Sequence, residues 1–215
     1  MAATPGLVVT CDTTLAPVLT RLGNAYTARS GMRVFVFPTG PGLILPQLER
    51  DIQNDIVVTQ MPILQQAAQQ GIIESADVTR WSNSLVIAGL RGSSATEGIF
   101  AACDPTPASD MDGPAVLAKI GLRPTRVVGA VDTDEVVFLL ASGAAQAGLL
   151  HMTDVRTDTR LNVIRPIPAD IQAPIIYGAS VTRLSARPNP QGFVEFLAMA
   201  DATRLLTDGG LEARI

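Results

Sequence analysis

The sequence is poor in the residues that build several common kinds of site. Aromatic residues make up 4% of its 215 residues, cysteine occurs twice and histidine once. So few rings argue against a sugar site walled by stacked aromatics, and so few thiols and imidazoles exclude a zinc ribbon or a disulfide scaffold. Lys119 is the single lysine among 16 basic residues, and the net charge is -4. No basic stripe is visible, so we expect no nucleic-acid partner.

Long apolar runs are missing as well. The longest run, 136–152, is interrupted by Ser142, Gly143 and Gln146, and it falls short of the roughly 20 apolar residues that a membrane-spanning helix requires. Residues 1–5 lack the basic and apolar regions of a signal peptide. We expect a periplasmic or extracytoplasmic protein whose leader is absent from this chain, although a cytosolic protein can begin in the same way.

The chain does contain enough apolar material for a packed core. Hydrophobic residues make up 47% of it, and the mean hydropathy is +0.29. Short apolar runs alternate with helical patterns, which predicts βαβ units and an α/β fold. The predicted strands are 7–11, 33–37, 55–59, 85–90, 98–103, 126–131, 147–152, 161–165 and 175–181. The predicted helices are 15–30, 43–50, 61–70, 113–120, 136–142, 190–199 and 201–208.

Four predicted strands end in a polar turn that precedes a helix. These turns are 10–14, 37–42, 107–110 and 132–134. In open α/β sheets, ligands bind beyond the carboxyl ends of the strands, and each helix start offers unpaired N–H groups and a partial positive charge. Several such starts would form an anion site without any Lys or Arg. The simpler interpretation is that Ser, Thr and Asp cap the helices here, as they do in any α/β protein.

Seven segments of the chain resemble one known family in their residues and in their order. The segments are LVVTCDTTLAPVL at 7–19, GLILPQLE at 42–49, NDIVVT at 54–59, SNSLVI at 82–87, CDP at 103–105, AAQAGLLHMTD at 144–154 and FVEFL at 193–197. Together they resemble the periplasmic molybdate-binding proteins, which are the substrate-binding subunits of oxyanion ABC importers. The resemblance covers nearly the whole chain in the right order.

The resemblance implies a two-lobed type II periplasmic binding protein fold. Each lobe would be a three-layer α/β sandwich with a mostly parallel sheet. Residues 1–84 and 179–215 would form lobe I and residues 85–178 lobe II, with the ligand cleft between the lobes and a hinge that closes it. The protein would then be a monomer that is not an enzyme, has no cofactor beyond a bound oxyanion or metal ligand, and works with an ABC permease in the membrane.

The site residues that the resemblance implies are mainly hydroxyls and helix-start amides. Thr14, with Thr13 beside it, stands where the family has a serine, and His151 stands where it has a tyrosine. A second family serine falls near Pro41, which has neither a hydroxyl nor an N–H, so neighbouring residues would have to replace it. Asp12 adds a carboxylate that opposes a dianion. The expected ligand-binding set is Thr13, Thr14, Thr39, Gly40, Gly42, Ser109, Thr133 and His151.

A soft metal is the alternative ligand. Cys11, Cys103 and His151 all lie at predicted strand ends, with Met61 similarly placed. Such a set favours copper or zinc over hard cations. A Cys11–Cys103 disulfide is less favourable, since it would lock a hinged binder shut. The plain interpretation is that both cysteines are small buried hydrophobes.

Two further expectations concern function. The single imidazole predicts a ligand affinity that changes between about pH 5 and 8, where histidine changes charge. The same scaffold would also suit a cytosolic sensor or an enzyme. A serine hydrolase is poorly supported because the sequence contains no G-x-S-x-G motif.

Overall fold

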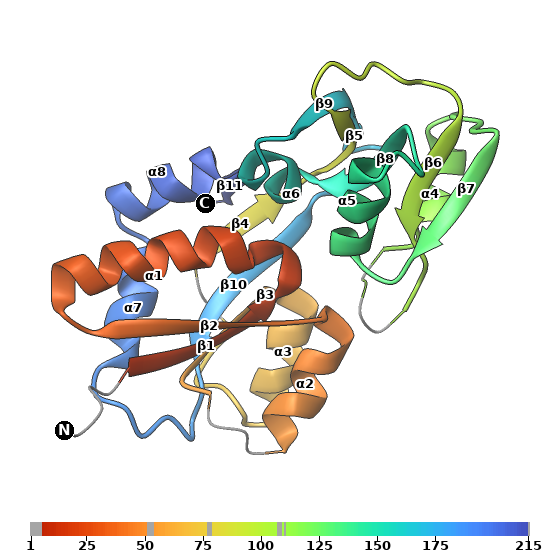
Figure 1. Ribbon diagram of the computed structural model, residues 1–215. Helices are drawn as coiled ribbons and strands as arrows, with labels where there is room; N and C mark the ends of the chain where they lie inside the picture. The colour runs from red at the N-terminus through yellow and green to blue at the C-terminus, as the bar shows by residue number, and fades with distance from the viewer. Residues whose placement is uncertain (1–5, 51–53, 77–78, 107–108, 110, 215) are drawn as a thin grey trace. The chain divides into compact units, whose positions relative to one another are not determined.

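The computed structural model describes residues 6–50, 54–76, 79–106, 109 and 111–214. The chain divides into two compact units, which we call unit 1 (Met1–Ser82 and Ile176–Ile215) and unit 2 (Asn83–Ile175). Each unit is built on one sheet with helices on both faces (Figure 1). The predicted α/β class is therefore confirmed.

The sheet of unit 1 has six strands in the order β11-β4-β10-β3-β1-β2. Their bounds are β1 (Gly6–Asp12), β2 (Arg33–Thr39), β3 (Ile56–Gln60), β4 (Arg80–Asn83), β10 (Ile175–Val181) and β11 (Leu211–Arg214). Strand β1 runs parallel to both β2 and β3, whereas β10 runs antiparallel to β3. Because Asp12 is paired in register with Thr39, β1 and β2 end at the same edge of the sheet.

Helices cover both faces of this sheet. They are α1 (Ala16–Ser30), α2 (Pro41–Glu49), α3 (Met61–Gln69), α7 (Pro190–Leu197) and α8 (Ala200–Asp208), and the 3-10 helix η1 (Thr13–Leu15) leads into α1. Gly23 of α1 lies directly against the side chain of Val34 on β2. Val57 of β3 belongs instead to the apolar cluster of α2 and α3. Val34 pairs with Leu7 of β1, and Val57 pairs with Thr10 of β1. Because side chains alternate along a strand, those of Leu7 and Thr10 point to opposite faces of the sheet.

The sheet of unit 2 has five strands in the order β7-β6-β8-β5-β9. Their bounds are β5 (Leu85–Leu90), β6 (Ile99–Cys103), β7 (Arg126–Ala130), β8 (Ala147–His151) and β9 (Leu161–Pro166). Strand β6 is parallel to β7 and β8, while β5 is antiparallel to β8 and β9. Both sheets are thus mixed, with their parallel pairs among the strands that lead into helices.

Two helices of unit 2 lie on opposite faces of its sheet. The unit contains α4 (Gly113–Lys119), α5 (Thr133–Ala141) and α6 (Met152–Thr157). Gly113 of α4 lies against Ala102, while Val136 of α5 lies against Gly148, which pairs with Ala101. Since Ala101 and Ala102 are consecutive strand residues, they face opposite sides.

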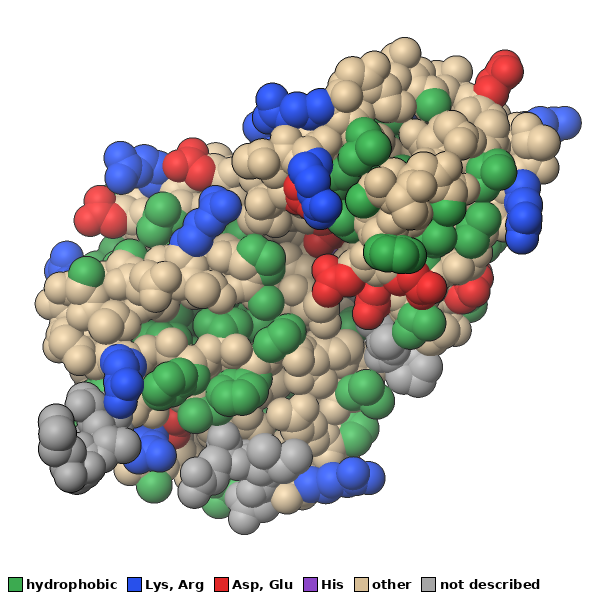
Figure 2. Space-filling model, in the orientation of Figure 1, with side chains coloured by type: hydrophobic (Ala, Val, Ile, Leu, Met, Phe, Trp, Pro, Cys, Tyr) green, Lys and Arg blue, Asp and Glu red, His purple; other side chains and the backbone are tan. Residues whose placement is uncertain are grey.

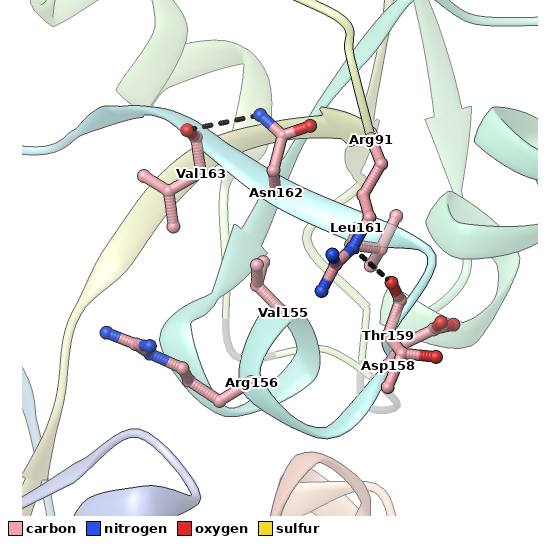
Figure 3. Close-up of a pocket in the computed structure, with 8 residues that line it drawn as sticks. All are labelled: Arg91, Val155, Arg156, Asp158, Thr159, Leu161, Asn162 and Val163. Atoms are coloured by element: carbon pink, nitrogen blue, oxygen red, sulfur yellow. Dashed lines mark hydrogen bonds between the residues drawn. The ribbon is translucent and has the colours of Figure 1, made fainter.

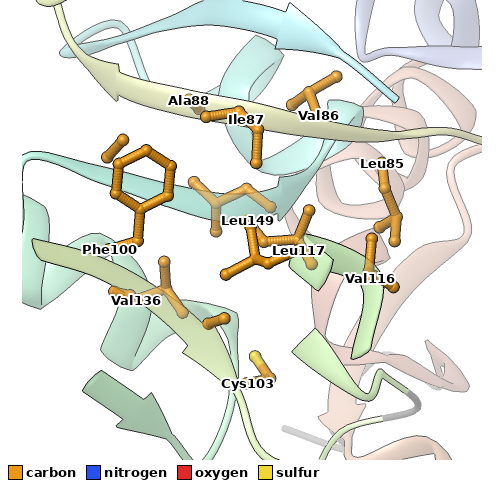
Figure 4. Packing of buried hydrophobic residues seen from close by; sticks show 14 of the residues in the cluster. Leu85, Val86, Ile87, Ala88, Phe100, Cys103, Val116, Leu117, Val136 and Leu149 are labelled. Atoms are coloured by element: carbon orange, nitrogen blue, oxygen red, sulfur yellow. The ribbon is translucent and has the colours of Figure 1, made fainter. Parts of the chain in front are cut away.

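The core of unit 2 encloses the neighbouring strands β6 and β8. Phe100, Val136 and Leu149 are fully buried within it, together with Cys103 (Figure 4). Every residue of β8 is buried. Close packing of this kind fixes the strand ends, so Cys103 and His151 have defined positions at the carboxyl ends of β6 and β8.

Several expected boundaries were wrong. The structure adds β4, α6 and β11, which the sequence patterns did not predict. Helix α5 begins at Thr133, three residues before the predicted start, because Asp132 accepts a hydrogen bond from the Glu135 N–H and caps the helix there. Helix α2 begins at Pro41, before the predicted Leu43, since proline suits a first helical turn.

Among the described residues, no helix has the length and apolar character needed to cross a membrane.

Candidate functional site

A buried carboxylate marks the carboxyl end of β1. Asp12 is 1% exposed, and its Oδ1 accepts a hydrogen bond from the Thr59 hydroxyl at 2.5 Å. Although Asp12 occupies the N-cap position of η1, its side chain does not cap that helix. It is turned instead toward the end of β3. A negative charge is thereby placed at the edge of the sheet where the expected ligand donors lie.

The thiol of the neighbouring Cys11 is buried. Burial raises the pKa of Cys11 far above its ordinary value, and the charge of Asp12 raises it further. A metal would bind the thiolate, which is the form that this environment disfavours. Cys103 is buried too, neither cysteine forms a disulfide, and the two belong to different units. Within the described part of the chain, no three His, Cys, Asp or Glu residues are grouped so that they could hold a metal ion.

Unit 1 brings five of the expected ligand-binding residues to one edge of its sheet. Thr13 and Thr14 form η1 directly after β1. Thr39 ends β2, and its hydroxyl donates to Gln47 Oε1 of α2 at 3.1 Å. Gly40 is the N-cap of α2, and its carbonyl accepts from the Leu43 N–H at 2.8 Å. Because Pro41 has no N–H, Gly42 supplies the first amide of this helix.

In unit 2, Thr133 opens α5 among several carboxylates. Asp132 caps the helix, while Glu135 reaches back to accept from the Val131 N–H at 2.7 Å. Thr133 is buried between them. Burial raises the pKa of Asp134, and the charges of Asp132 and Asp154 raise it further. Figure 2 shows acidic side chains gathered beside α5. This helix start is therefore less attractive to a multiply charged anion than its dipole alone predicts.

Ser109 does not lie at a helix start. Its hydroxyl accepts from the Met111 N–H at 3.2 Å, and α4 begins only at Gly113, where Asp112 is the cap. The helix that was predicted to follow this turn, 113–120, is present as α4. Residues 107, 108 and 110 of that turn lie outside the described residues.

His151 joins the end of β8 to the start of α6. The residue is 3% exposed. Its backbone N–H donates to Asp154 Oδ2 at 2.9 Å, and its Nδ1 lies 3.4 Å from the same oxygen. The charge of Asp154 also raises the pKa of Asp134 at the start of α5, and Val136 of α5 lies against Gly148 of β8. Unit 2 thus brings Thr133 and His151 to one region.

Sequence reasoning missed the groups that hold His151 and Asp12 in place. Asn83 and Thr153 are fully buried and bonded to each other beside His151. Thr59 bonds Asp12 from a strand 47 residues away. Asp154 had a local signal, since an acid three residues after an N-cap is the pattern of a capping box. Asn83 and Thr59 had no such signal, because their partners are distant in sequence.

Comparison with known proteins supports the fold. No curated protein sequence matches the chain. The structure resembles the periplasmic molybdate-binding protein of Azotobacter vinelandii, with 17% identity, a TM-score of 0.78 and coverage of 97% of this chain and 100% of that one. It also resembles the sulfate-binding protein SubI of Mycobacterium tuberculosis H37Rv, with 12% identity, a TM-score of 0.67 and coverage of 95% and 85%. A third similar structure is PEB3 of Campylobacter jejuni bound to L-phospholactate, with 12% identity, a TM-score of 0.70 and coverage of 97% and 100%.

These likenesses confirm the expected type II periplasmic binding protein fold. The family model of the bacterial extracellular solute-binding protein matches residues 7–212, which is nearly the whole chain. This chain therefore belongs to the bacterial extracellular solute-binding protein family.

Proposed function

We propose that this chain is the extracytoplasmic binding component of an ABC importer. It captures a small solute and delivers it to a membrane permease, acting as a monomer and without catalysis. Family membership supports this role. So does the likeness over nearly the full length to binding proteins named for molybdate and sulfate. Since similar structures carry chemically different ligands, the ligand follows from this chain's own side chains.

The donors at the strand ends favour a ligand rich in acceptor oxygens. Thr14 and Thr133 contribute hydroxyls, and Gly42 contributes an amide near the start of α2. Helix starts attract negative charge through their unpaired N–H groups and their dipole. We propose that these donors hold one oxyanion.

Asp12 supports one class of oxyanion over another. A carboxylate accepts hydrogen bonds and cannot donate them. Molybdate and sulfate carry no proton at neutral pH and offer it no donor, whereas inorganic phosphate keeps a proton that it can donate. A hydrogen bond to a charged group contributes about 1.5–3 kcal/mol, which is roughly a ten- to 150-fold difference in Kd. We therefore propose a phosphate-type oxyanion in preference to the molybdate type.

A thermal-shift and calorimetric comparison tests this proposal. The probes are phosphate, arsenate, sulfate, molybdate, tungstate, Cu(I) and Zn(II). Phosphate at 100 times its Kd should add about 2.7 kcal/mol to the free energy of unfolding, and sulfate and molybdate should bind at least about tenfold more weakly. Equal or tighter binding of molybdate would overturn the choice of ligand. Stabilisation by a metal alone would overturn the oxyanion site.

A further inference from the structure

A pocket of about 430 Å³ lies in unit 2, away from the residues described above. It is formed by the turn after β5, the end of α6 and the start of β9, and its lining residues are shown in Figure 3. His151 precedes α6 whereas Asp158 follows it. A six-residue helix is about 9 Å long, so the pocket and the candidate ligand site lie at opposite ends of α6.

The polar lining of this pocket carries an excess of positive charge. Arg91 and Arg156 both line it, and Asp158 is the one carboxylate among its eight lining residues. Asp158 already binds Arg160, with Nη2 at 2.6 Å and Nε at 3.0 Å from its oxygens. Those hydrogen bonds hold the pKa of Asp158 below its ordinary value. The negative charge in the lining is thereby neutralised, while two guanidinium groups remain.

One of these arginines is held in position by the backbone. Arg91 Nε donates to the Thr159 carbonyl at 2.6 Å, and its own N–H donates to the Arg160 carbonyl at 2.8 Å. The two Nη groups of Arg91 lie beyond that anchor. A guanidinium presents paired N–H donors that match the two oxygens of a carboxylate or phosphate. An anion in this pocket would thus bind to the Arg91 guanidinium, whose orientation is already fixed.

The rest of the lining is apolar. Val155 and Leu161 are buried side chains, and Val163 adds to the same wall. In Figure 3, Val155 lies between Arg156 and the Arg91–Thr159 hydrogen bond. Asn162 uses its amide nitrogen within the protein, donating to the Ser93 and Val163 carbonyls at 3.3 Å. Pockets of this size with apolar walls and a few placed charges are typical of sites for small organic ligands.

We infer that this pocket is a second binding site, for an organic anion with a carboxylate-type head group and a short apolar body. The anchored Arg91 binds the head group, Arg156 adds a second positive charge to the lining, and the Val155, Leu161 and Val163 side chains contact the body. The site lies at the other end of α6 from His151, so we expect it to bind its ligand without displacing the proposed oxyanion.

Isothermal titration with hexanoate tests the inference, with acetate and hexanol as probes of the head group and the body alone. Hexanoate should bind saturably, at least tenfold more tightly than either control. Arg156→Glu should weaken hexanoate binding at least tenfold. Arg126→Glu makes the same charge change on an exposed residue of β7, at the other edge of the sheet, and should leave the Kd unchanged.

Three results would overturn the second site. They are a lack of saturable hexanoate binding, an Arg156→Glu variant that binds as tightly as the wild type, and loss of binding in a Thr133→Val variant. The last result would assign hexanoate to the ligand site proposed above. Phosphate titrated into Arg156→Glu keeps the two proposals separate, because its affinity there should equal that of the wild type.

Discussion

Asn83 and Thr153 form a reciprocal side-chain pair across 70 residues of sequence. Asn83 Nδ2 donates to Thr153 Oγ1 at 2.8 Å, and Asn83 Oδ1 accepts from the Thr153 N–H at 3.4 Å. Asn83 is the first residue of unit 2, and Thr153 lies in the first turn of α6. The Met152 N–H adds a bond to the Ser84 carbonyl at 2.8 Å. The segment that enters unit 2 therefore holds the helix that begins beside His151.

Asn83→Ala should destabilise the protein and weaken phosphate binding together. The variant leaves the buried Thr153 hydroxyl without its donor, which costs about 1–3 kcal/mol. It also releases the start of α6, and with it His151. Urea unfolding and phosphate calorimetry measure the two effects. Thr153→Ser keeps the hydroxyl and should remain close to wild type in both. An Asn83→Ala protein with unchanged unfolding would show that the pair is not a structural anchor.

Asp12→Asn should change which oxyanion binds best. Asparagine Oδ1 can still accept the Thr59 hydroxyl, so the link between β1 and β3 is kept. The negative charge is removed, and the amide supplies donors for oxygens that carry no proton. Sulfate and molybdate should gain at least about tenfold relative to phosphate.

Asp55→Asn is the matched control for this experiment. Asp55 is also buried, and it accepts the Val8 N–H at 2.8 Å and the Ser185 hydroxyl at 2.7 Å. It lies before β3, at the strand end opposite Thr59. This variant should lose stability without changing the order of oxyanion affinities. A common shift in both variants would mean that general loss of charge, not the position of Asp12, sets the preference.

The parts of the fold that sequence predicted are those with a strong local pattern. The run at Leu7 is apolar and β-branched and is buried as β1, and the segment at Ile175 forms β10 within its predicted bounds. Strands β4 and β11 have the sequences RWSN and LEAR. Four residues of mixed polarity carry no period, so only pairing within the sheet makes them strands.

The candidate site likewise contains some features that a local pattern predicts and others that no local pattern predicts. The cap of α5 was predicted because a polar turn before an apolar helix is a local signal, whereas Thr133 was expected as a ligand-binding residue only from the family resemblance. The Asp12–Thr59 and Asn83–Thr153 pairs join residues 47 and 70 positions apart. Their existence depends on strand order, which no local pattern contains. Ser109 was expected beside a helix start because its turn is polar, but the polar cap that is used is Asp112.

The contribution of Asp134 to the stability of unit 2 should fall as the pH rises past the ordinary range of aspartate. The pKa of Asp134 is raised in the folded protein, so the folded state holds this proton more tightly than the unfolded state does. Its contribution is present below the unfolded value, about 3.9, and is lost as the pH rises through the folded value. Asp134→Asn should therefore stabilise the protein at pH 7 and have little effect at pH 3.

Asp158→Asn gives the opposite sign in the same measurement. The pKa of Asp158 is lowered by hydrogen bonds from Arg160. Its contribution is present above the unfolded value and is lost as the pH falls through the folded value. Urea unfolding of both variants between pH 3 and 7 separates the two cases. The Asp158→Asn effect should be small, about 0–1 kcal/mol, because the pair faces solvent and is screened by salt. A destabilised Asp134→Asn protein at pH 7 would contradict the proposed electrostatics.

Gly148→Ala should disturb the packing of α5 against the sheet. An added Cβ at this position would lie 2.6 Å from Val136 Cγ1 and 3.2 Å from the Ala101 carbonyl oxygen. Overpacking of this kind costs about 1–3 kcal/mol. Because Thr133 opens the same helix, phosphate affinity should fall as well. Urea unfolding and phosphate calorimetry measure the two effects.

A double-mutant cycle identifies the contact responsible. Val136→Ala alone removes a buried side chain and should cost about 2 kcal/mol. It also clears the space that the new methyl group needs, so Gly148→Ala with Val136→Ala should cost less than the sum of the two single changes by about 1 kcal/mol. Val116→Ala on α4 lies on the other face of the sheet, and its effect should add to that of Gly148→Ala within about 0.5 kcal/mol. Equal coupling in both cycles would mean that Gly148→Ala acts through the whole sheet instead of through α5.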